Sequence, residues 1–204
     1  MSMTISYQVG AGLYLNITNR CPNRCVFCVR NLADAVGDAH TLWLPREPTL
    51  REIQADLDGR NLSDYPELTF CGYGEPTQRL ETLLAAAAHV KQASPSTPIR
   101  LNTNGQANLL AGADITPRLA GVFDAVSVSL NAARAADYEA LCRPTYAGAF
   151  EAVLDFSRRA ARYVPRVAMT VVGGTLPSED IEACRALAVS CGATFRVRCP
   201  CHEP

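Results

Sequence analysis

Cys21-Pro22-Asn23-Arg24-Cys25-Val26-Phe27-Cys28, near the N-terminus of a 204-residue chain, places three cysteines in the spacing C-x3-C-x2-C. Three thiolates can hold a [4Fe–4S] cluster by three of its irons and leave the fourth iron open to a ligand from outside the protein. Most electron-transfer clusters use four cysteines instead. The spacing therefore indicates chemistry at a cluster rather than electron storage alone.

Two other uses of these cysteines have to be weighed. A structural zinc site usually shows two close cysteine pairs, or one such pair with a histidine pair. The three histidines, His40, His89 and His202, are scattered along the chain. A disulfide framework is weaker still, because a chain of this length can build a core without cross-links. Zinc remains the main alternative to the cluster.

Length and composition limit the class of protein. The length fits one domain that covers residues 1–204. The net charge of −1 provides no attraction to nucleic acid or to an anionic membrane. The sequence shows no signal peptide and no long apolar run, so we expect no membrane attachment. Nine cysteines without a signal peptide indicate a reducing compartment, and we expect a cytoplasmic protein.

Short β-branched runs alternate with helical patterns along the chain. The expected strands cover residues 13–18, 67–73, 99–103, 125–130, 166–172 and 194–198. The expected helices cover residues 24–35, 49–57, 79–92, 107–119, 133–141, 149–163 and 178–189. Alternating strands and helices predict βαβ units and a parallel sheet. Six units fit this length, whereas the eight of a complete barrel do not.

Three local signals refine the helices. Thr49, three residues before Glu52, has the spacing of a capping box. A break is expected near Thr116-Pro117, because proline removes a helical hydrogen bond. Ser178 is expected to cap the last helix.

Most of the expected strands carry polar residues on one face. Successive strand residues point to opposite faces, whereas parallel strands covered on both faces usually read as unbroken apolar runs. The polar residues at alternate positions are Tyr14, Asn16, Thr18, Thr69, Cys71, Tyr73, Arg100, Asn102, Ser127, Ser129, Thr194, Arg196 and Arg198. This pattern predicts a curved sheet with helices outside and a polar concave side that holds cofactor and substrate.

The cysteine motif, with Phe27 directly before its last cysteine, resembles the signature of the radical SAM superfamily. The resemblance implies an α/β fold, a partial (β/α)6 barrel of six parallel strands with outer helices. It implies a [4Fe–4S] cluster on Cys21, Cys25 and Cys28, with S-adenosylmethionine (SAM) on the open iron. One electron from the reduced cluster would cleave SAM, and a 5′-deoxyadenosyl radical would abstract hydrogen from a substrate.

A second motif follows the second expected strand. Gly72-Tyr73-Gly74-Glu75-Pro76 resembles the Gly-Gly-Glu-Pro-like motif of the superfamily, in which the backbone and the acid receive the ammonium group of SAM. The alternative is an ordinary glycine-rich turn. A dinucleotide-binding G-x-G-x-x-G motif is excluded, because position 77 is threonine.

Further SAM contacts are implied by the resemblance at the ends of later strands. Asn102 is expected to face SAM, and Ser129 and Asn131 its ribose or carboxylate, although a local turn bond explains Asn131 equally well. Arg143 resembles a basic residue suited to clamp a carboxylate, with an ordinary surface arginine as the alternative. Phe27 is expected beside the adenine. We expect Asn104 to form a plain turn with the following glycine.

The C-terminal tail offers a possible second metal site. Cys199, Cys201 and His202 supply three ligands at most, and the sequence shows no obvious fourth. We therefore do not expect an auxiliary cluster.

The substrate is the least determined feature. The size and the Cys71–Thr77 segment look most like small radical SAM proteins encoded beside TatD-type hydrolases, which indicates a functional link to such a hydrolase. We expect a small-molecule substrate or a protein loop, and an electron donor such as flavodoxin or ferredoxin. One alternative is an activase that makes a radical on a protein partner, and another is a non-catalytic Fe–S or zinc-binding module.

Overall fold

The computed structural model describes residues 3–199 and contains one seven-stranded sheet with the strands in sequence order. The strands are β1 Ser6–Val9, β2 Gly12–Leu15, β3 Leu68–Phe70, β4 Ile99–Thr103, β5 Ala125–Ser129, β6 Arg166–Val172 and β7 Thr194–Arg198. β2 to β7 run parallel to one another, and β1 pairs with β2 in the antiparallel direction.

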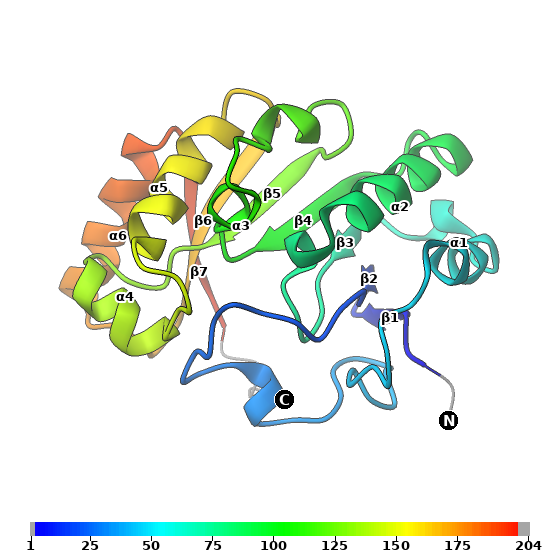
Figure 1. Cartoon of the computed structure of the whole chain (residues 1–204), viewed down its shortest axis with the longest axis horizontal. Helices are drawn as coiled ribbons and strands as arrows, with labels where there is room; N and C mark the ends of the chain where they lie inside the picture. The colour runs from blue at the N-terminus through cyan, green and yellow to red at the C-terminus, as the bar shows by residue number, and fades with distance from the viewer. Residues whose placement is uncertain (1–2, 200–204) are drawn as a thin grey trace.

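The helices lie along the outside of the curved sheet (Figure 1). The α-helices are α1 Leu50–Asp58, α2 Leu80–Ala93, α3 Ala107–Ala111, α4 Ala135–Cys142, α5 Ala149–Ala160 and α6 Ser178–Ser190. The 3-10 helices are η1 Val29–Asn31, η2 Leu62–Asp64, η3 Pro76–Arg79 and η4 Thr116–Leu119. The segment between β2 and α1 passes below the sheet in this view.

The alternation along the strands separates two faces of the sheet. Leu13 and Leu15 of β2, and Leu68 and Phe70 of β3, are completely buried in the apolar core beneath the helices. Their neighbours Tyr14 and Thr69 point to the concave side, as do the polar residues of later strands. The expected curved α/β sheet with a polar concave side is therefore confirmed.

All six predicted parallel strands are present, but the sheet contains a seventh strand, β1, that was not predicted. β4, β6 and β7 have the expected bounds. β1 was missed, and it forms a hairpin with β2 through Gly10, whose φ of 57° is in the left-handed region. The signal was two apolar-containing runs separated by glycine, which is typical of a hairpin.

The predicted helix over residues 24–35 is wrong, since only η1 forms there. Two backbone amides at the start of the segment bond elsewhere: Arg24 donates to Cys142 at 3.0 Å, and Val26 donates to Leu141 at 2.9 Å. The segment is thus held against the end of α4 rather than coiled on itself.

The capping signals had mixed outcomes. The Thr49–Glu52 capping box at α1 is confirmed, with both reciprocal bonds present. The helix expected over residues 107–119 is broken, as predicted, and Gly112 ends its first part in a left-handed conformation. Ser178 is not a cap: Pro177 occupies that position, and no side chain caps α6.

Within the described residues, no helix is both long and apolar enough to cross a membrane.

Candidate active site

A cavity of about 570 Å³ lies at the carboxyl edge of the parallel strands. Segments that follow β2, β3, β4, β5, β6 and β7 all contribute to its wall. In parallel α/β folds the carboxyl ends of the strands meet at one edge, where active sites form. The predicted site residues that line the cavity are Cys21, Cys25, Phe27, Cys28, Gly72, Tyr73, Gly74, Glu75, Asn102, Ser129 and Asn131.

The three cysteines of the motif lie together in the cavity wall. Burial raises the pKa of the Cys21 thiol to about 12, and burial also raises the pKa of Cys28. A hydrogen bond with the Cys142 thiol, together with burial, raises the pKa of Cys25. The three thiols therefore hold their protons at neutral pH, and loading with metal must release those protons.

Among residues 3–199, no three His, Cys, Asp or Glu side chains are placed to hold a single metal ion. A [4Fe–4S] cluster takes one thiolate at each of three separate irons, so its ligands do not have to converge on one point.

A buried amide network positions the start of the cysteine loop. Asn23 donates to the Tyr138 hydroxyl at 3.2 Å and accepts from Gln106 at 2.7 Å, and Gln106 also donates to Tyr138 at 3.1 Å. All three side chains are buried. The loop is therefore fixed against α4 and against the segment that follows β4.

Gly72 and Gly74 allow the loop after β3 to pack directly on the chain leading to Cys21. A Cβ atom at Gly72 would lie 2.1 Å from Oδ1 of Asn16, a buried residue whose amide donates to Leu42 at 2.7 Å. A Cβ atom at Gly74 would lie 2.3 Å from the carbonyl oxygen of Thr18. Glycine is required at both positions because neither neighbour has room to move.

Gly74→Ala is expected to displace the cysteine loop. The added methyl group meets the backbone carbonyls of Thr18 at 2.3 Å and Arg20 at 2.7 Å, so the main chain before Cys21 must shift. Overpacking of this kind costs about 1–3 kcal/mol. We expect a lower melting temperature and a reduced iron content after reconstitution.

The matched control for Gly74→Ala is Gly59→Ala. Gly59 has a φ of −75°, and an added Cβ atom would make ordinary contacts, the nearest at 3.4 Å. If Gly74→Ala binds iron and melts like Gly59→Ala, the two loops are not packed as described.

Tyr73 departs from the glycine of the family motif and anchors the segment between β2 and α1. Its hydroxyl donates to the Ala33 carbonyl, and its ring meets Trp43 edge-on with centroids 5.0 Å apart. It packs in a small apolar cluster with Tyr7 and Leu42. The side chain therefore fastens the cysteine-bearing segment to the loop after β3.

Glu75 joins the loops that follow β3 and β4. Its Oε1 accepts from the backbone and hydroxyl of Thr77 at 3.1 and 2.8 Å and from the Thr103 hydroxyl at 2.8 Å. Its Oε2 accepts from the Asn104 backbone at 2.7 Å. Burial raises the pKa of Glu75 despite these hydrogen bonds. Oε2 has one protein donor, so it keeps capacity for a ligand donor.

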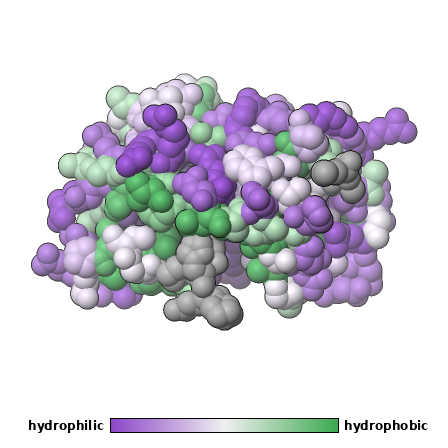
Figure 2. Space-filling view, turned by 90° about the horizontal axis from the view of Figure 1, so that it is seen from below, coloured by the Kyte–Doolittle hydropathy of each residue, from purple (hydrophilic) through white to green (hydrophobic). Residues whose placement is uncertain are grey.

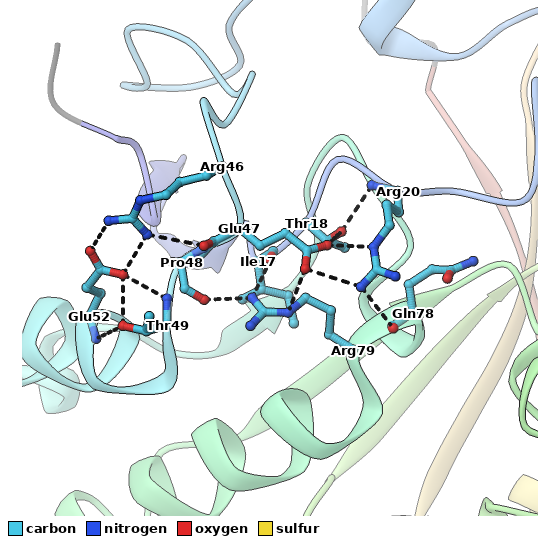
Figure 3. Close-up of polar contacts among 10 residues, drawn as sticks. All are labelled: Ile17, Thr18, Arg20, Arg46, Glu47, Pro48, Thr49, Glu52, Gln78 and Arg79. Carbon is cyan, nitrogen blue, oxygen red and sulfur yellow. Dashed lines mark hydrogen bonds and ion pairs between the residues drawn. The ribbon is translucent and has the colours of Figure 1, made fainter.

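A polar network around Glu47 supports both loops from outside the cavity (Figure 3). Glu47 accepts from the Thr18 hydroxyl at 2.6 Å and from Arg20 at 2.6 and 3.2 Å, and it lies 3.3 Å from Arg79. Arg79 also donates to the carbonyls of Ile17 and Pro48. Burial raises the pKa of Glu47, but the bonds from Thr18 and Arg20 outweigh it and lower the pKa overall.

Glu47→Ala is expected to loosen the chain before Cys21 with little change in overall stability. Glu47 is partly exposed, and such ion pairs contribute about 1 kcal/mol or less. We expect iron to be released to a chelator severalfold faster than from the wild type, measured by absorbance.

Glu81→Ala provides the comparison for Glu47→Ala. Glu81 accepts two hydrogen bonds from Arg118 at 2.7 and 2.8 Å on the outer helices, away from the cavity. Equal release rates for the two variants would show that the Glu47 network does not support the loop.

The ends of β4 and β5 place amide groups in the cavity. Oδ1 of Asn102, Nδ2 of Asn104 and Oδ1 of Asn131 are inaccessible to solvent and have no hydrogen-bond partner in the described chain. Asn131 has a φ of 58°, and its Nδ2 donates to the Cys142 sulfur at 3.6 Å. Asn104 does form the expected turn, since its Oδ1 accepts from the Gln106 backbone, but it also lines the cavity. Unpaired buried amide atoms are costly unless a ligand meets them.

Arg143 does not line the cavity. It is exposed, has a φ of 45°, and ends α4 in a left-handed conformation. Its backbone carbonyl accepts from Arg24 at 3.3 Å. The expected clamp on a carboxylate is therefore not placed at the site.

Phe27 both lines the cavity and packs against the core.

Some cavity residues were not among the expected cofactor contacts, although Ser127 and Arg198 were placed on the polar side of the sheet and Cys199 in the possible second metal site. Ser127 and Arg198 belong to the alternating polar faces, which was a usable signal. Asn23 gave none, because its partners lie far along the chain. Cys199 lines the cavity as well, whereas Cys201 and His202 of the possible second metal site lie outside the described residues.

The family follows from sequence comparison. The profile described as the radical SAM superfamily matches residues 15–188, most of the chain and all three cysteines of the motif. This chain belongs to the radical SAM superfamily. No curated relative matches it.

Solved structures share the fold of this radical SAM chain. SuiB of Streptococcus suis, bound to S-adenosylmethionine, is 14% identical with a TM-score of 0.66, and the match covers 92% of this chain and 38% of SuiB. SuiB bound to the precursor peptide SuiA is 12% identical with the same TM-score and coverage. Methylornithine synthase (PylB) is 12% identical, with a TM-score of 0.62 and coverage of 92% and 52%. This chain thus spans about half or less of these proteins.

The residues present fit the cofactors that the superfamily implies. Three thiols line the cavity and can serve as cluster ligands. The unpaired amide of Asn104 can donate to a carboxylate, and the unpaired oxygens of Asn102 and Asn131 can accept from an ammonium or hydroxyl group. SAM carries all of these groups.

Proposed function

We propose that this protein is a radical SAM enzyme with a [4Fe–4S] cluster on Cys21, Cys25 and Cys28. With SAM bound, the cluster would supply one electron for cleavage of the S–C5′ bond to methionine and a 5′-deoxyadenosyl radical, which would take hydrogen from the substrate. The observation that supports this most is that the three thiols and the unpaired amides line the same cavity.

The chain's own residues have separable parts in this proposal. The cysteines would hold the cluster, and Oε2 of Glu75 would accept a hydrogen bond from the SAM ammonium. Asn102, Ser129 and Asn131 would contact the rest of SAM, and Phe27 would lie beside its adenine. Gly72, Gly74 and Tyr73 act indirectly, by fixing one loop against the other.

We propose further that residues 1–204 act as a single radical SAM core domain in the cytoplasm, with flavodoxin or ferredoxin as electron donor. The oxygen sensitivity of such clusters would require anaerobic handling. The Cys71–Thr77 segment supports placement among the small radical SAM proteins linked to TatD-type hydrolases. This placement leaves the substrate open.

A second candidate is an activase that makes a radical on a protein loop. Val26, Leu32 and Trp43, in the segment after β2, are 45%, 54% and 42% exposed. Figure 2 shows the side of the molecule on which that segment lies, with apolar side chains near the middle of the face between hydrophilic ones. Exposed apolar groups beside a cavity are typical of a surface that meets another protein.

The test is anaerobic reconstitution with iron and sulfide, followed by EPR of the dithionite-reduced protein with and without SAM. 5′-Deoxyadenosine is assayed in the same sample. A [4Fe–4S]⁺ signal that SAM shifts, together with 5′-deoxyadenosine, supports the proposal. Stoichiometric zinc, or a cluster that does not respond to SAM, would identify a binding module instead. A tight complex with a glycyl-radical protein would favour the activase.

A further inference from the structure

The concave face of the sheet carries arginines on three of its strands: Arg100 on β4, Arg166 on β6, and Arg196 and Arg198 on β7. The orientation of β7 follows from Phe195, which packs against the core and lies under the Arg185 guanidinium of α6 at 4.9 Å. Because strand residues alternate, Arg196 points away from the helices and toward the concave side.

The arginines of this face differ in their partners. Glu67 accepts from Arg100 at 2.5 and 2.9 Å and lies 3.9 Å from Arg166. Arg196 is exposed and makes no ion pair or hydrogen bond within residues 3–199. Burial raises the pKa of the Tyr14 phenol of β2 overall, and the nearby charges of Arg100 and Arg196 oppose that rise. The ion pairs of this face join Glu67 to Arg100 and Arg166, and within residues 3–199 none of them reaches Arg196.

The strand register connects Arg196 to the cavity. Arg196 lies opposite Thr170 of β6, which lies opposite Ser129 of β5, a cavity residue. Arg198, two residues further along β7, lines the cavity itself. β7 is at the far end of the strand order from β2, whose following loop holds the cysteines. Arg196 is thus on the same strand face as Arg198, beside the cavity.

We propose that the substrate of this cavity carries an oxyanionic group, a carboxylate or a phosphate, that binds the Arg196 guanidinium on β7. The inference rests on the proposed function, because it names the substrate class of the same site. An arginine offers two parallel N–H donors that match either oxyanion. Unpaired positive charge on a concave wall also raises the local concentration of anionic molecules.

The alternative use of Arg196 is protection of the sheet edge. β7 is an edge strand among the described residues, and edge strands often carry charged residues that discourage pairing with other chains. Such an arginine needs only solvent, whereas an oxyanion site must show saturable binding. The two uses are separable by experiment.

The test measures the melting temperature of the reconstituted protein against sodium phosphate and sodium malonate, at ionic strength held constant with sodium chloride. We expect a saturable rise with at least one anion, and the stronger one identifies the oxyanion as phosphate or carboxylate. Arg196→Gln should weaken the apparent affinity by about tenfold, and Arg196→Lys by less. Arg158→Gln, which removes an exposed and unpaired arginine of the outer helix α5, should match the wild type.

Two results would overturn this inference. The first is no saturable effect in the wild type, or an equal effect in Arg196→Gln. The second is loss of the anion effect when SAM is added, which would assign the arginine to the SAM carboxylate. Failure of the proposed function is distinguishable, because EPR of the wild-type sample reports the SAM response without added anion.

Discussion

Cys21→Ala is expected to lose the cluster and all cleavage of SAM. Cys21 comes directly after the backbone that Gly74 packs against. Its thiol lines the cavity together with those of Cys25 and Cys28. Removing one of three thiolates leaves two ligands and a second open iron, which does not retain a [4Fe–4S] cluster. The measurement is iron and sulfide content after anaerobic reconstitution, with 5′-deoxyadenosine formation in the same sample.

Cys184→Ala is the control for this experiment. Cys184, on α6, is completely buried and does not line the cavity, so its loss should cost some stability but leave the iron content unchanged. If Cys21→Ala kept full cluster iron and activity, the thiol would not be a ligand and the assignment of the site would fail.

Signals that act over a few residues predicted much of this protein. The C-x3-C-x2-C spacing located the wall of the cavity, and alternation along β4, β6 and β7 gave strand bounds that the structure reproduces. The Thr49–Glu52 capping box was readable because both of its partners lie within one helical turn. Each of these features depends on residues that are close together along the chain, so it can be predicted from a single sequence.

Features that depend on distant partners could not be predicted. In the segment expected as a helix over residues 24–35, the amides of Arg24 and Val26 bond to the end of α4, more than a hundred residues away. The hydrogen bonds of Asn23 could not be predicted for the same reason, because its partner Tyr138 is also far along the chain. Arg143 was misplaced because a motif in sequence does not fix the direction of a side chain, and the left-handed end of α4 carries this one outside the cavity.

Glu75→Ala is the other change with a large expected effect, and the structure alters what it should do. Sequence alone predicts weaker SAM binding with the cluster retained. The buried carboxylate also accepts four hydrogen bonds from Thr77, Thr103 and Asn104. Each buried donor left without an acceptor costs about 1–3 kcal/mol. We therefore expect Glu75→Ala to lower the melting temperature strongly before SAM binding can be judged.

Glu75→Gln separates the two parts played by this residue. The glutamine keeps the shape and one acceptor oxygen, but it carries no negative charge and so cannot form an ion pair with an ammonium group. We expect stability nearer to the wild type, with SAM affinity weakened about tenfold or more, as for loss of a hydrogen bond between charged groups. Equilibrium binding of SAM to both proteins at pH 7 measures this. Equal affinities would remove Glu75 from the SAM site and leave it as a link between loops.

The pH dependence of stability provides an independent check on Glu75. Burial raises its folded-state pKa above the ordinary 4.5, so the folded protein binds this proton more tightly than the unfolded chain does. Stability contributed by the group is therefore present at pH values below 4.5 and lost as the pH rises toward the folded-state pKa. The melting temperature of the wild type relative to Glu75→Gln should fall over that range. Bound SAM should reduce the fall, because its ammonium favours the ionised carboxylate. A difference that stays constant with pH would show that Glu75 is not held in an environment that opposes its charge.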